Sequence, residues 1–286
     1  RKEKRKNLLI YDAVNKILIH NNLIAPKLIN QRYHENFIEV NDLGKITVLD
    51  HIKKNKNKFK IFEEIIDLLI KLQNIKIRKV KNFQNKLYKI PVYSNKLLFN
   101  EAKLFCEWYV PENIKQNRIK INKRLQVIIK SLIKNLKLQN HIFVHRDFHV
   151  SNLMLVKKKL GIIDSQDAVM GNEAYDLASL VDDVRYKTSV SFKNKIYKLY
   201  LKKNKKNINK IFFFNDFEIL SVLRNLKIIG IFTRLAKTEN KSIYLKLIPY
   251  TWKLIDLRCK NNKLLIDLKD FLYKNFSKKV RNKYAN

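Results

Sequence analysis

Apolar residues recur at intervals of three and four along most of this chain. The first such stretch covers residues 7–21, where Leu8, Tyr11, Val14 and Leu18 fall on one side of a helix. The same spacing predicts further amphipathic helices. They cover residues 60–74, 97–109, 119–138 and 173–186, and several stretches from residue 216 to the C-terminus, among them 218–235. Helices therefore dominate the predicted structure beyond residue 60.

Two short strands are predicted after the first helix. Residues 23–29 contain Ala25-Pro26 and lead into one strand, and residues 37–40 form a second short run with strand character. The polar stretch that follows, residues 41–44, ends in a glycine. Taken by themselves, these four residues are interpreted as an ordinary turn.

A β-hairpin is predicted near the middle of the chain. Residues 153–156 and 160–163 are short apolar runs, and the three residues between them are lysines. This pattern is typical of two strands joined by a tight polar turn. Antiparallel pairing of the two runs brings Asp164 beside Asn152. A small mixed lobe, followed by a larger helical lobe with this hairpin embedded in it, gives the fold class α+β.

Three polar residues around this hairpin have the spacing of a phosphoryl-transfer site. Asp147 closes the tripeptide His145-Arg146-Asp147, Asn152 follows five residues later, and Asp164 stands twelve residues after that. Phosphoryl transfer needs a carboxylate that orients and deprotonates the acceptor hydroxyl, and oxygen ligands that hold Mg²⁺ against the phosphates. The spacing predicts Asp147 as the catalytic base, with Asn152 and Asp164 as the magnesium ligands.

Two other interpretations account for this cluster less well. A buried polar turn with salt-bridged carboxylates would need no particular spacing of its residues. A zinc site would use His141, His145 and His149, but Cys106 and Cys259 lie far from the cluster, and zinc sites commonly draw on cysteine. We expect His145 to brace the loop through its ring nitrogens, and His149 to line the acceptor pocket.

Four stretches of the sequence carry a resemblance to a known family. They are residues 145–154 (HRDFHVSNLM), 161–183 (GIIDSQDAVMGNEAYDLASLVDD), 224–235 (RNLKIIGIFTRL) and 241–249 (KSIYLKLIP). In these stretches the chain resembles the aminoglycoside phosphotransferase and choline kinase-like superfamily. Within it, the chain is most similar to the bacterial anomeric kinases for N-acetylmuramate and N-acetylglucosamine. With weaker matches near the N-terminus, the resemblance covers most of the 286 residues.

The resemblance implies a protein-kinase-like fold with two lobes. Residues 1–44 would be a truncated small N-lobe and hinge, and residues 45–286 the larger, mostly helical C-lobe with the catalytic loop and the acceptor site. In this fold Asn41, Asp42 and Leu43 form the hinge, whose backbone groups hydrogen-bond the edge of adenine.

The resemblance also assigns roles to individual residues. The base and the two magnesium ligands predicted above match those of the family. Asp167 resembles an additional carboxylate next to the metal site. Asp176 resembles a structural aspartate that supports the catalytic loop together with His145 and Arg146; as a first-turn carboxylate it would also interact favourably with a helix dipole.

The sequence departs from the family pattern in three ways. Ser165 follows Asp164 where the family usually has an aromatic residue, and Asn172 follows Gly171 where a proline is usual. The chain has only four glycines, and no glycine-rich loop that could cradle phosphates can be drawn from them. Because the chain also starts at Arg1 rather than at methionine, we expect the first strands of a longer protein to be missing.

A basic stripe follows one of the predicted C-terminal helices. Arg224, Lys227 and Arg234 recur at helical spacing and share one face. Two interpretations stay open: a solvated face, common on a lysine-rich chain, or a cationic wall of the acceptor site. The second suits N-acetylmuramate, whose lactyl carboxylate can take a bidentate arginine contact. Glu101 and Trp108, seven residues apart, are further candidates for the sugar site, although such a tryptophan is more often part of the core.

Net charge raises the question of a nucleic-acid partner. The chain has 61 Lys and Arg against 25 Asp and Glu, a formal charge of +36, which usually indicates nucleic-acid binding. Here the excess is mostly lysine, spread along the chain together with many Asn and Ile residues, as A- and T-rich codons would produce. We therefore expect no specific nucleic-acid partner, and incidental RNA binding that weakens with salt. The lysine- and asparagine-rich residues 202–210 are expected to be an exposed loop or a solvated helix end.

The expected activity is that of a cytoplasmic small-molecule kinase. Two cysteines without a disulfide framework suit a reducing cytoplasm, and no run approaches the roughly 20 apolar residues of a membrane span. With ATP and Mg²⁺, the protein would phosphorylate the anomeric hydroxyl of an amino sugar in cell-wall sugar recycling. The alternatives are an aminoglycoside- or choline-type kinase with another hydroxyl acceptor, and a non-catalytic kinase-like binding module. The oligomeric state is left open.

Overall fold

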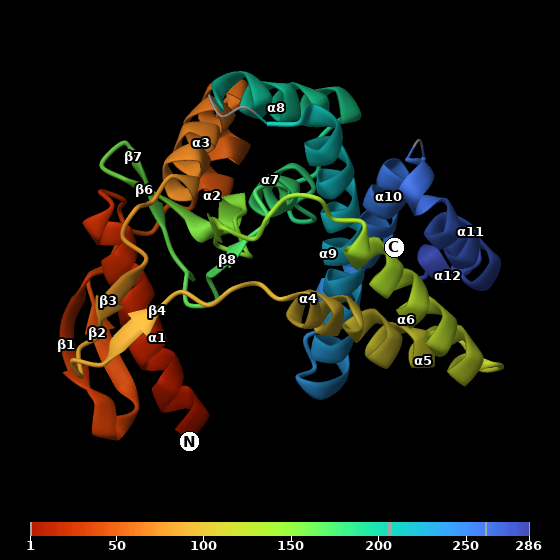
Figure 1. Cartoon of the computed structure of the whole chain (residues 1–286), viewed down its shortest axis with the longest axis horizontal. Coiled ribbons are helices and arrows are strands. Elements are labelled where there is room, and N and C mark those ends of the chain that lie inside the picture. The colour runs from red at the N-terminus through yellow and green to blue at the C-terminus, as the bar shows by residue number, and fades with distance from the viewer. Residues whose placement is uncertain (1, 205–207, 261, 286) are drawn as a thin grey trace. The chain divides into compact units, whose positions relative to one another are not determined.

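The computed structural model of the protein describes residues 2–204, 208–260 and 262–285 (Figure 1). The chain divides into two compact units. The first unit comprises Arg1–Val92 and Gln139–Lys206, and the second comprises Tyr93–Leu138 and Asn207–Asn286. This division falls elsewhere than the lobe boundary at residue 44, which stays a prediction.

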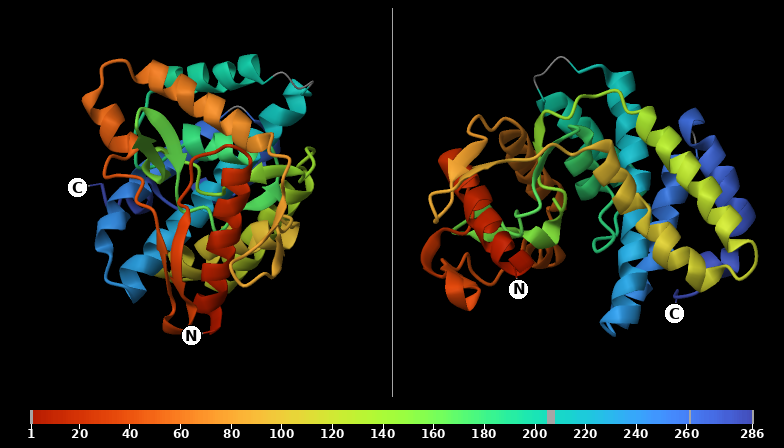
Figure 2. Two further views of the ribbon diagram at one scale, coloured as in Figure 1. Left: turned by 90° about the vertical axis from the view of Figure 1, so that its left-hand side faces the viewer. Right: turned by 60° about the horizontal axis from the view of Figure 1, so that its bottom comes forward.

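The first unit begins with helix α1 (Lys2–His20), which contains most of the predicted helix over residues 7–21. Two antiparallel hairpins accompany this helix, β1 (Leu28–Arg32) with β2 (Phe37–Val40), and β3 (Lys79–Lys81) with β4 (Leu87–Lys89). Both hairpins contact α1, through β2 and β3 (Figures 1 and 2). A short 3₁₀ turn, η1 (Tyr33–Glu35), joins β1 to β2. The apolar face of α1 is fully buried at Ala13, Val14, Ile17 and Leu18.

Helices make up much of the remainder of this unit. They are α2 (Val48–Lys54), α3 (Lys58–Gln73), α7 (Ala174–Val181) and α8 (Val190–Lys203). Polar caps begin three of them, because Thr47, Asn57 and Ser189 each accept a backbone N–H of the first turn. The predicted helix over residues 60–74 corresponds to α3. Of the low-complexity residues 202–210, residues 205–207 lie outside the described part of the chain.

Helix α7 is shorter than the helix predicted over residues 173–186, and the reason is a buried ion pair. Asp182 is the residue at which α7 ends, and its carboxylate lies 3.3 Å from the Lys193 ammonium of α8. Both side chains are almost completely buried, so each needs the other as a partner. Sequence periodicity does not reveal this pairing, since the lysine comes from a different helix.

The predicted hairpin is present in the structure. Strand β6 (Leu153–Val156) pairs with β7 (Lys159–Ile162), and Leu153 stands opposite Ile162. Lys157 and Lys158 connect the strands with positive φ angles of 46° and 65°, as a two-residue type I′ turn requires. A second pair, β5 (Ile142–Val144) with β8 (Val169–Gly171), is fully buried. Between β5 and β6 runs the segment that carries the predicted catalytic residues, closed by a 3₁₀ turn, η3 (Val150–Asn152).

The second unit is helical in its described residues. Its elements are α4 (Asn95–Ala102), the π-helical segment η2 (Phe105–Tyr109), α5 (Val110–Asn113), α6 (Arg118–Lys134), α9 (Lys210–Thr238), η4 (Ser242–Leu247), α10 (Ile248–Cys259), η5 (Lys263–Leu265), α11 (Ile266–Asn275) and α12 (Lys278–Arg281). Helix α9 packs against η2, α10 and α4 (Figure 2). Four buried rings form an aromatic core with centroids 4.9–5.9 Å apart, namely Phe105, Tyr109, Trp252 and Phe276.

The helix predicted over residues 97–109 is present, but its winding changes within it from the α-helical α4 to the π-helical η2. The packing at Gly230 of α9 explains why this stretch is constrained. A Cβ at position 230 would lie 2.4 Å from the carbonyl carbon of Leu104 and 2.6 Å from the backbone nitrogen of Phe105. The two backbones are therefore in direct contact at a site that only glycine permits.

Replacing Gly230 by alanine is expected to destabilise the protein. The added methyl group meets backbone atoms, which cannot rotate away, so α9 and η2 must separate. Overpacking of this kind costs about 1–3 kcal/mol or more. Urea unfolding followed by circular dichroism would measure the loss, with Lys237→Ala on an exposed turn of α9 as the control. An unchanged midpoint for Gly230→Ala would contradict the close contact.

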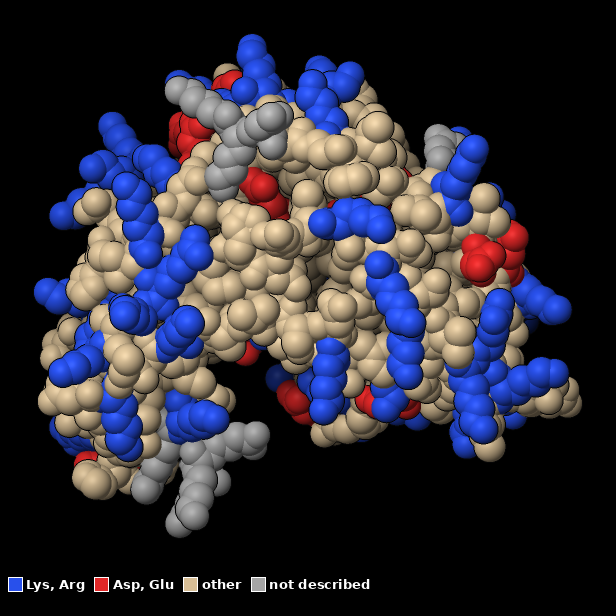
Figure 3. All heavy atoms as spheres, in the orientation of Figure 1, with Lys and Arg blue, Asp and Glu red and all other residues tan. Residues whose placement is uncertain are grey.

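Positive charge is dispersed along the sequence, and one face of the molecule shows the same distribution. On the face drawn in Figure 3, Lys and Arg side chains are scattered widely rather than gathered into one patch. This distribution favours the interpretation of the lysine excess as a property of composition. Among the described residues, no helix has the length and apolar character needed to cross a membrane.

Candidate active site

The loop between β5 and β6 is held by one buried carboxylate. Asp176 of α7 is completely buried, and its two oxygens accept the backbone N–H groups of His145 (2.7 Å) and Arg146 (3.1 Å). Arg146 has a φ of 74°, a left-handed conformation that is unfavourable for a residue with a Cβ. Asp176 thus compensates for backbone strain directly before Asp147.

His145 fastens the same loop to the residue before Asp164. Its ring is buried, and Nε2 lies 3.0 Å from the backbone carbonyl oxygen of Ile163. Because that oxygen only accepts, Nε2 carries the hydrogen, while Nδ1 has no hydrogen-bond partner. Burial lowers the pKa of His145 below its usual value, so the ring is neutral. One ring nitrogen therefore makes the bracing contact that we expected of both.

Acid is expected to destabilise the fold through His145. The folded pKa lies below the unfolded value of about 6.5, so the unfolded state binds more protons between the two. The contribution of His145 is fully present above the unfolded pKa and is lost as the pH falls towards the folded pKa. Urea midpoints between pH 7.5 and 5.5 would measure the slope, which should be smaller in His145→Gln. An identical slope in both proteins would contradict this origin.

Asn152 and Asp164 meet at the open end of the hairpin. The Ile163 N–H donates to the Asn152 carbonyl oxygen (3.1 Å), which extends the β6–β7 pairing up to Asp164. The Asn152 Nδ2 donates to the carbonyl oxygen of Asp147 (3.1 Å) and so fixes the amide. The Asp164 carboxylate accepts from Gln166 Nε2 (2.8 Å), on a backbone with a φ of 62°. Both side chains line the same cavity of ≈ 450 Å³.

The walls of this cavity combine apolar and polar surfaces. It is lined by Tyr11, Pro26, Val40, Asn41, Asp42, Leu43, Gly44, Asn152, Met154, Ile163 and Asp164. The apolar members offer flat contact surface, whereas Asn152 and Asp164 contribute oxygens. The predicted hinge residues Asn41, Asp42 and Leu43 thus lie in one wall together with both predicted magnesium ligands. Gly44, with a φ of 98°, ends this stretch and donates its N–H to Asp42 Oδ1 (2.8 Å).

Comparison with known proteins agrees with this geometry. Residues 29–204 match the family described as "Phosphotransferase enzyme family" (APH). The chain belongs to this family. It is 30% identical over 249 residues to the N-acetylmuramate/N-acetylglucosamine kinase of Neisseria meningitidis serogroup B, a match that covers 84% of this chain and 69% of that protein.

Solved structures of similar fold are kinases of small molecules. The gentamicin complex of APH(2″)-IIa has a TM-score of 0.57 at 17% identity, covering 88% of this chain and 82% of that one. Choline kinase LicA from Streptococcus pneumoniae has a TM-score of 0.54 at 12% identity, covering 91% and 79%. The predicted α+β kinase-like fold and family are confirmed. The protein is a phosphotransferase with an alcohol group as acceptor.

One residue of the cavity of Asn152 and Asp164 was not predicted from the sequence. This residue is Tyr11, which was interpreted only as an apolar position of the first helix. In the structure it lines the cavity together with Asp164. Burial raises the pKa of Tyr11, and the Asp164 charge adds to the rise, so the phenol keeps its proton. A signal was present in the sequence, because Tyr11 and Asn15 put two polar groups four residues apart, next to the apolar positions of the same helix.

The acidic residue next to it serves a different purpose. Asp12 is 3% exposed, accepts the backbone N–H of Phe83 (2.7 Å) and pairs with Lys16 (2.9 Å). It therefore fastens α1 to the loop between β3 and β4. Asp12 is not among the residues that line the cavity of Asn152 and Asp164.

Asp167 contacts Arg146, and its role as a further carboxylate beside the metal site stays a prediction. Its side chain is 63% exposed, with Oδ1 3.5 Å from Arg146 Nη1. The same nitrogen donates to the Asp167 carbonyl oxygen (3.0 Å). Asp167 and Arg146 thus hold each other, and Asp167 does not line the cavity. His149, which follows the base by two residues, is buried in the first unit.

The candidate acceptor residues of the second unit are more buried than a solvated stripe would be. Arg224 is 3% exposed and Lys227 8% exposed, so the solvated-face interpretation is wrong for both. The Lys227 ammonium pairs with Glu101 at 3.2 Å. Arg224 Nη1 is buried, and none of the described residues hydrogen-bonds it. Arg234 and Trp108 are half-buried.

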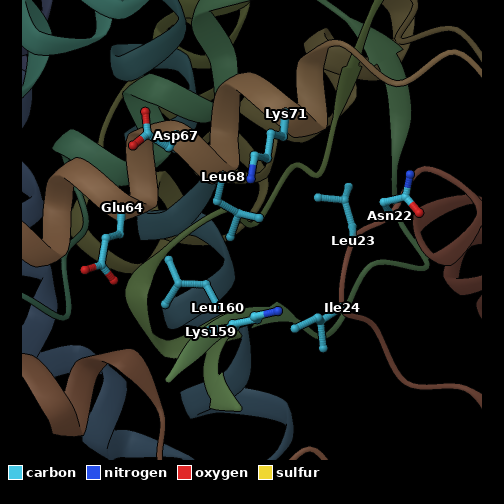
Figure 4. A pocket seen from close by; sticks show the side chains of 9 residues that line it. All are labelled: Asn22, Leu23, Ile24, Glu64, Asp67, Leu68, Lys71, Lys159 and Leu160. Carbon is cyan, nitrogen blue, oxygen red and sulfur yellow. The ribbon is translucent and has the colours of Figure 1, made fainter. Parts of the chain in front are cut away.

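A further cavity of the first unit contains none of the predicted residues. It has a volume of ≈ 470 Å³ and is bounded by the loop after α1, by α3 and by β7. Figure 4 shows its lining of Asn22, Leu23, Ile24, Glu64, Asp67, Leu68, Lys71, Lys159 and Leu160. Of its two acidic lining residues, Glu64 and Asp67, the second is paired, because its carboxylate lies 2.7 Å from the Lys203 ammonium.

The donor set at Asn152 and Asp164 fits magnesium. Mg²⁺ takes hard oxygen ligands, keeps several waters and binds proteins through one or two carboxylates plus substrate phosphates. A carboxylate and an amide oxygen in one cavity meet that description. In the described part of the chain, no group of three or more His, Cys, Asp and Glu side chains is arranged to hold a metal ion.

Proposed function

We propose that this protein transfers the γ-phosphoryl group of ATP to the anomeric hydroxyl of an amino sugar, N-acetylmuramate or N-acetylglucosamine. The observation that carries the proposal is the cavity that Asn152 and Asp164 share with residues 41–44. The acceptor rests on the relative from Neisseria meningitidis, whose name specifies these two sugars. A role in cell-wall sugar recycling, which the family resemblance implies, is part of the proposal.

The cavity suits a nucleotide along its whole length. Pro26, Val40 and Met154 offer apolar surface to the adenine ring. In the described part of the chain, Asp42 and Leu43 make no backbone-to-backbone hydrogen bond, so their groups are available to the edge of the base. At the other end, Asn152 and Asp164 would hold Mg²⁺. When bound, the ion neutralises the phosphate charge during transfer.

Asp147 is the base in this proposal. It lies on the same loop as Asn152 and is half-buried, and therefore accessible to solvent. Asp176 and His145 fix the backbone on one side of it, and the Asn152 amide bonds its carbonyl oxygen on the other. A carboxylate held this way can accept the proton of an acceptor hydroxyl and keep its oxygen aligned, which is most of what a kinase contributes.

Arg224 is proposed as the group that recognises the lactyl carboxylate of N-acetylmuramate. A buried guanidinium nitrogen without a partner is unfavourable, and a bidentate carboxylate would relieve that cost. Lys227 is a poorer candidate, because Glu101 already pairs with it. His149, Trp108 and Arg234 stay predictions as acceptor-binding residues.

An acceptor panel tests this function. Labelled ATP would be offered with N-acetylmuramate, N-acetylglucosamine, an aminoglycoside and choline, and the position of the phosphate would be determined by NMR. We expect transfer to the anomeric oxygen of the amino sugars. Arg224→Gln should lower kcat/KM for N-acetylmuramate by about 10-fold or more, the worth of a charged hydrogen bond, and spare N-acetylglucosamine. Lys237→Ala is the matched control for loss of a cation on α9.

Two outcomes would contradict the proposed function, and a third would contradict only the role of Arg224. Transfer only to the aminoglycoside or to choline would assign a different acceptor. ATP binding without transfer to any acceptor would indicate a non-catalytic kinase-like module. Equal losses for both sugars in Arg224→Gln would leave the sugar assignment intact and remove Arg224 from carboxylate recognition.

A further inference from the structure

The residue after Asp164 makes an unusual contact with helix α1. Ser165 is completely buried, and its hydroxyl donates to Asn15 Oδ1 at 2.7 Å. Asn15 is 2% exposed, and the two residues are 150 positions apart in the sequence. The family resemblance led us to expect an aromatic residue at position 165, which would contact a neighbouring helix by packing alone.

This hydrogen bond is buried, and apolar residues flank Asn15 along α1. On α1, the neighbours Val14, Ile17 and Leu18 are fully buried. In such a low-dielectric environment a hydrogen bond is strong, and losing one partner leaves the other unsatisfied. The bond is also directional, so it fixes the distance between the two backbones more narrowly than an apolar contact does.

Asn15 connects this bond to the cavity. Tyr11 precedes it by one helical turn and lines the cavity together with Asp164. The Asn15 amide acts on Tyr11, where it partly offsets the burial that raises the pKa of the phenol. Among the described residues, Asn15 Nδ2 has no hydrogen-bond partner, so the bond that ties Asn15 in place is the one from Ser165, one helical turn from the residue that lines the cavity of Asp164.

The conformation of Asp164 makes it sensitive to its neighbour. Its φ of 62° is a left-handed conformation, which a residue with a Cβ keeps only when the surrounding contacts impose it. The Gln166 side chain donates a hydrogen bond to its carboxylate (2.8 Å). Ser165, the residue between them, is tied to α1 by its bond to Asn15. Displacement of Ser165 would rotate the Asp164 carboxylate within the cavity.

We propose that Asn15 and Ser165 are positioning residues that couple helix α1 to the magnesium carboxylate Asp164. The inference rests on the proposed function only in taking Asp164 as a ligand of the metal–nucleotide complex. Neither residue touches the substrate in this assignment. Their effect is on the affinity for the divalent ion, since groups behind metal ligands commonly change affinity by about 10- to 100-fold.

The experiment measures Mn²⁺ binding in the presence of ADP, by electron paramagnetic resonance, for the wild type and Ser165→Ala. We expect the Mn²⁺ dissociation constant to rise about tenfold while ADP binding without metal stays within about twofold. In steady-state assays, the Mg²⁺ concentration for half-maximal rate should rise in parallel, with kcat at saturating Mg²⁺ nearly retained. A purely structural role would lower thermal stability without this separation.

A matched control comes from helix α7. Ser179 is also completely buried, and within the described part of the chain its hydroxyl has no hydrogen-bond partner. Ser179→Ala removes a buried hydroxyl from the same unit without touching α1, so Mn²⁺ affinity should stay at the wild-type value. If Ser165→Ala does not fold, the exchanged pair Asn15→Ser with Ser165→Asn tests the same bond, and should bind Mn²⁺ within about threefold of the wild type.

The possible results separate this proposal from the proposed function. Wild-type Mn²⁺ affinity in a folded Ser165→Ala, or an equal loss in Ser179→Ala, would overturn the positioning role and leave sugar phosphorylation untouched. A selective loss in Ser165→Ala, in a protein that phosphorylates no amino sugar, would support the positioning role and overturn the acceptor. A wild type that binds no Mn²⁺ with ADP would overturn both.

Discussion

Asp147→Asn is expected to lower kcat for sugar phosphorylation by about 10²- to 10⁴-fold, the usual contribution of a general base. The amide keeps the size of the side chain but cannot accept the proton. The loop should stay in place, because Asp176 and His145 hold its backbone. Initial rates with labelled ATP, together with circular dichroism, would measure both properties.

The control for this variant is Asp267→Asn, which neutralises an exposed carboxylate in the first turn of α11. It should leave kcat unchanged. Near-normal sugar phosphorylation by Asp147→Asn would contradict the role of this residue. A loss of helical signal in Asp147→Asn would instead attribute the effect to folding.

Asp164→Ala is expected to have the second largest effect. Removing one of two oxygen ligands should lower kcat/KM for ATP by roughly 10²-fold or more and raise the Mg²⁺ requirement. The fold should be retained, because the Asp164 carboxylate is exposed and accepts a hydrogen bond from the nearby Gln166 side chain. Titration of Mg²⁺ at fixed ATP would separate lost metal affinity from lost turnover.

Asp167→Ala is the matched comparison for this variant. The family resemblance makes Asp167 a further carboxylate of the metal site, whereas its side chain is 63% exposed beside Arg146. We therefore expect a much smaller change in Mg²⁺ requirement than for Asp164→Ala. Equal effects of the two substitutions would bring Asp167 back as a magnesium ligand.

The hairpin was the most predictable part of the site. Two apolar runs around three lysines specify a short antiparallel pair, and the observed strands β6 and β7 match them within one residue. Register then follows from the tight turn, so Asn152 and Asp164 come together from spacing alone. Local chemistry is enough here because the contacting residues lie only twelve positions apart.

Helix limits were less predictable where packing decides them. The predicted helix over residues 97–109 gives way to η2, at the place where Gly230 allows backbone contact. Helix α7 ends at Asp182 because Lys193 of another helix pairs with it. Hydrophobic periodicity contains neither partner, so it predicts neither the change of winding at η2 nor the early end of α7.

The sequence by itself predicted the chemistry, because a carboxylate, an amide and a second carboxylate stand at the spacing expected of a phosphoryl-transfer site, on one loop and one hairpin. Tertiary structure alone decided which side chains surround it. Asp12 bonds a residue 71 positions away, and Ser165 bonds one 150 positions away. Whether a polar side chain of a helix faces a cavity, a neighbouring loop or another helix depends on such distant contacts, and no local pattern encodes them.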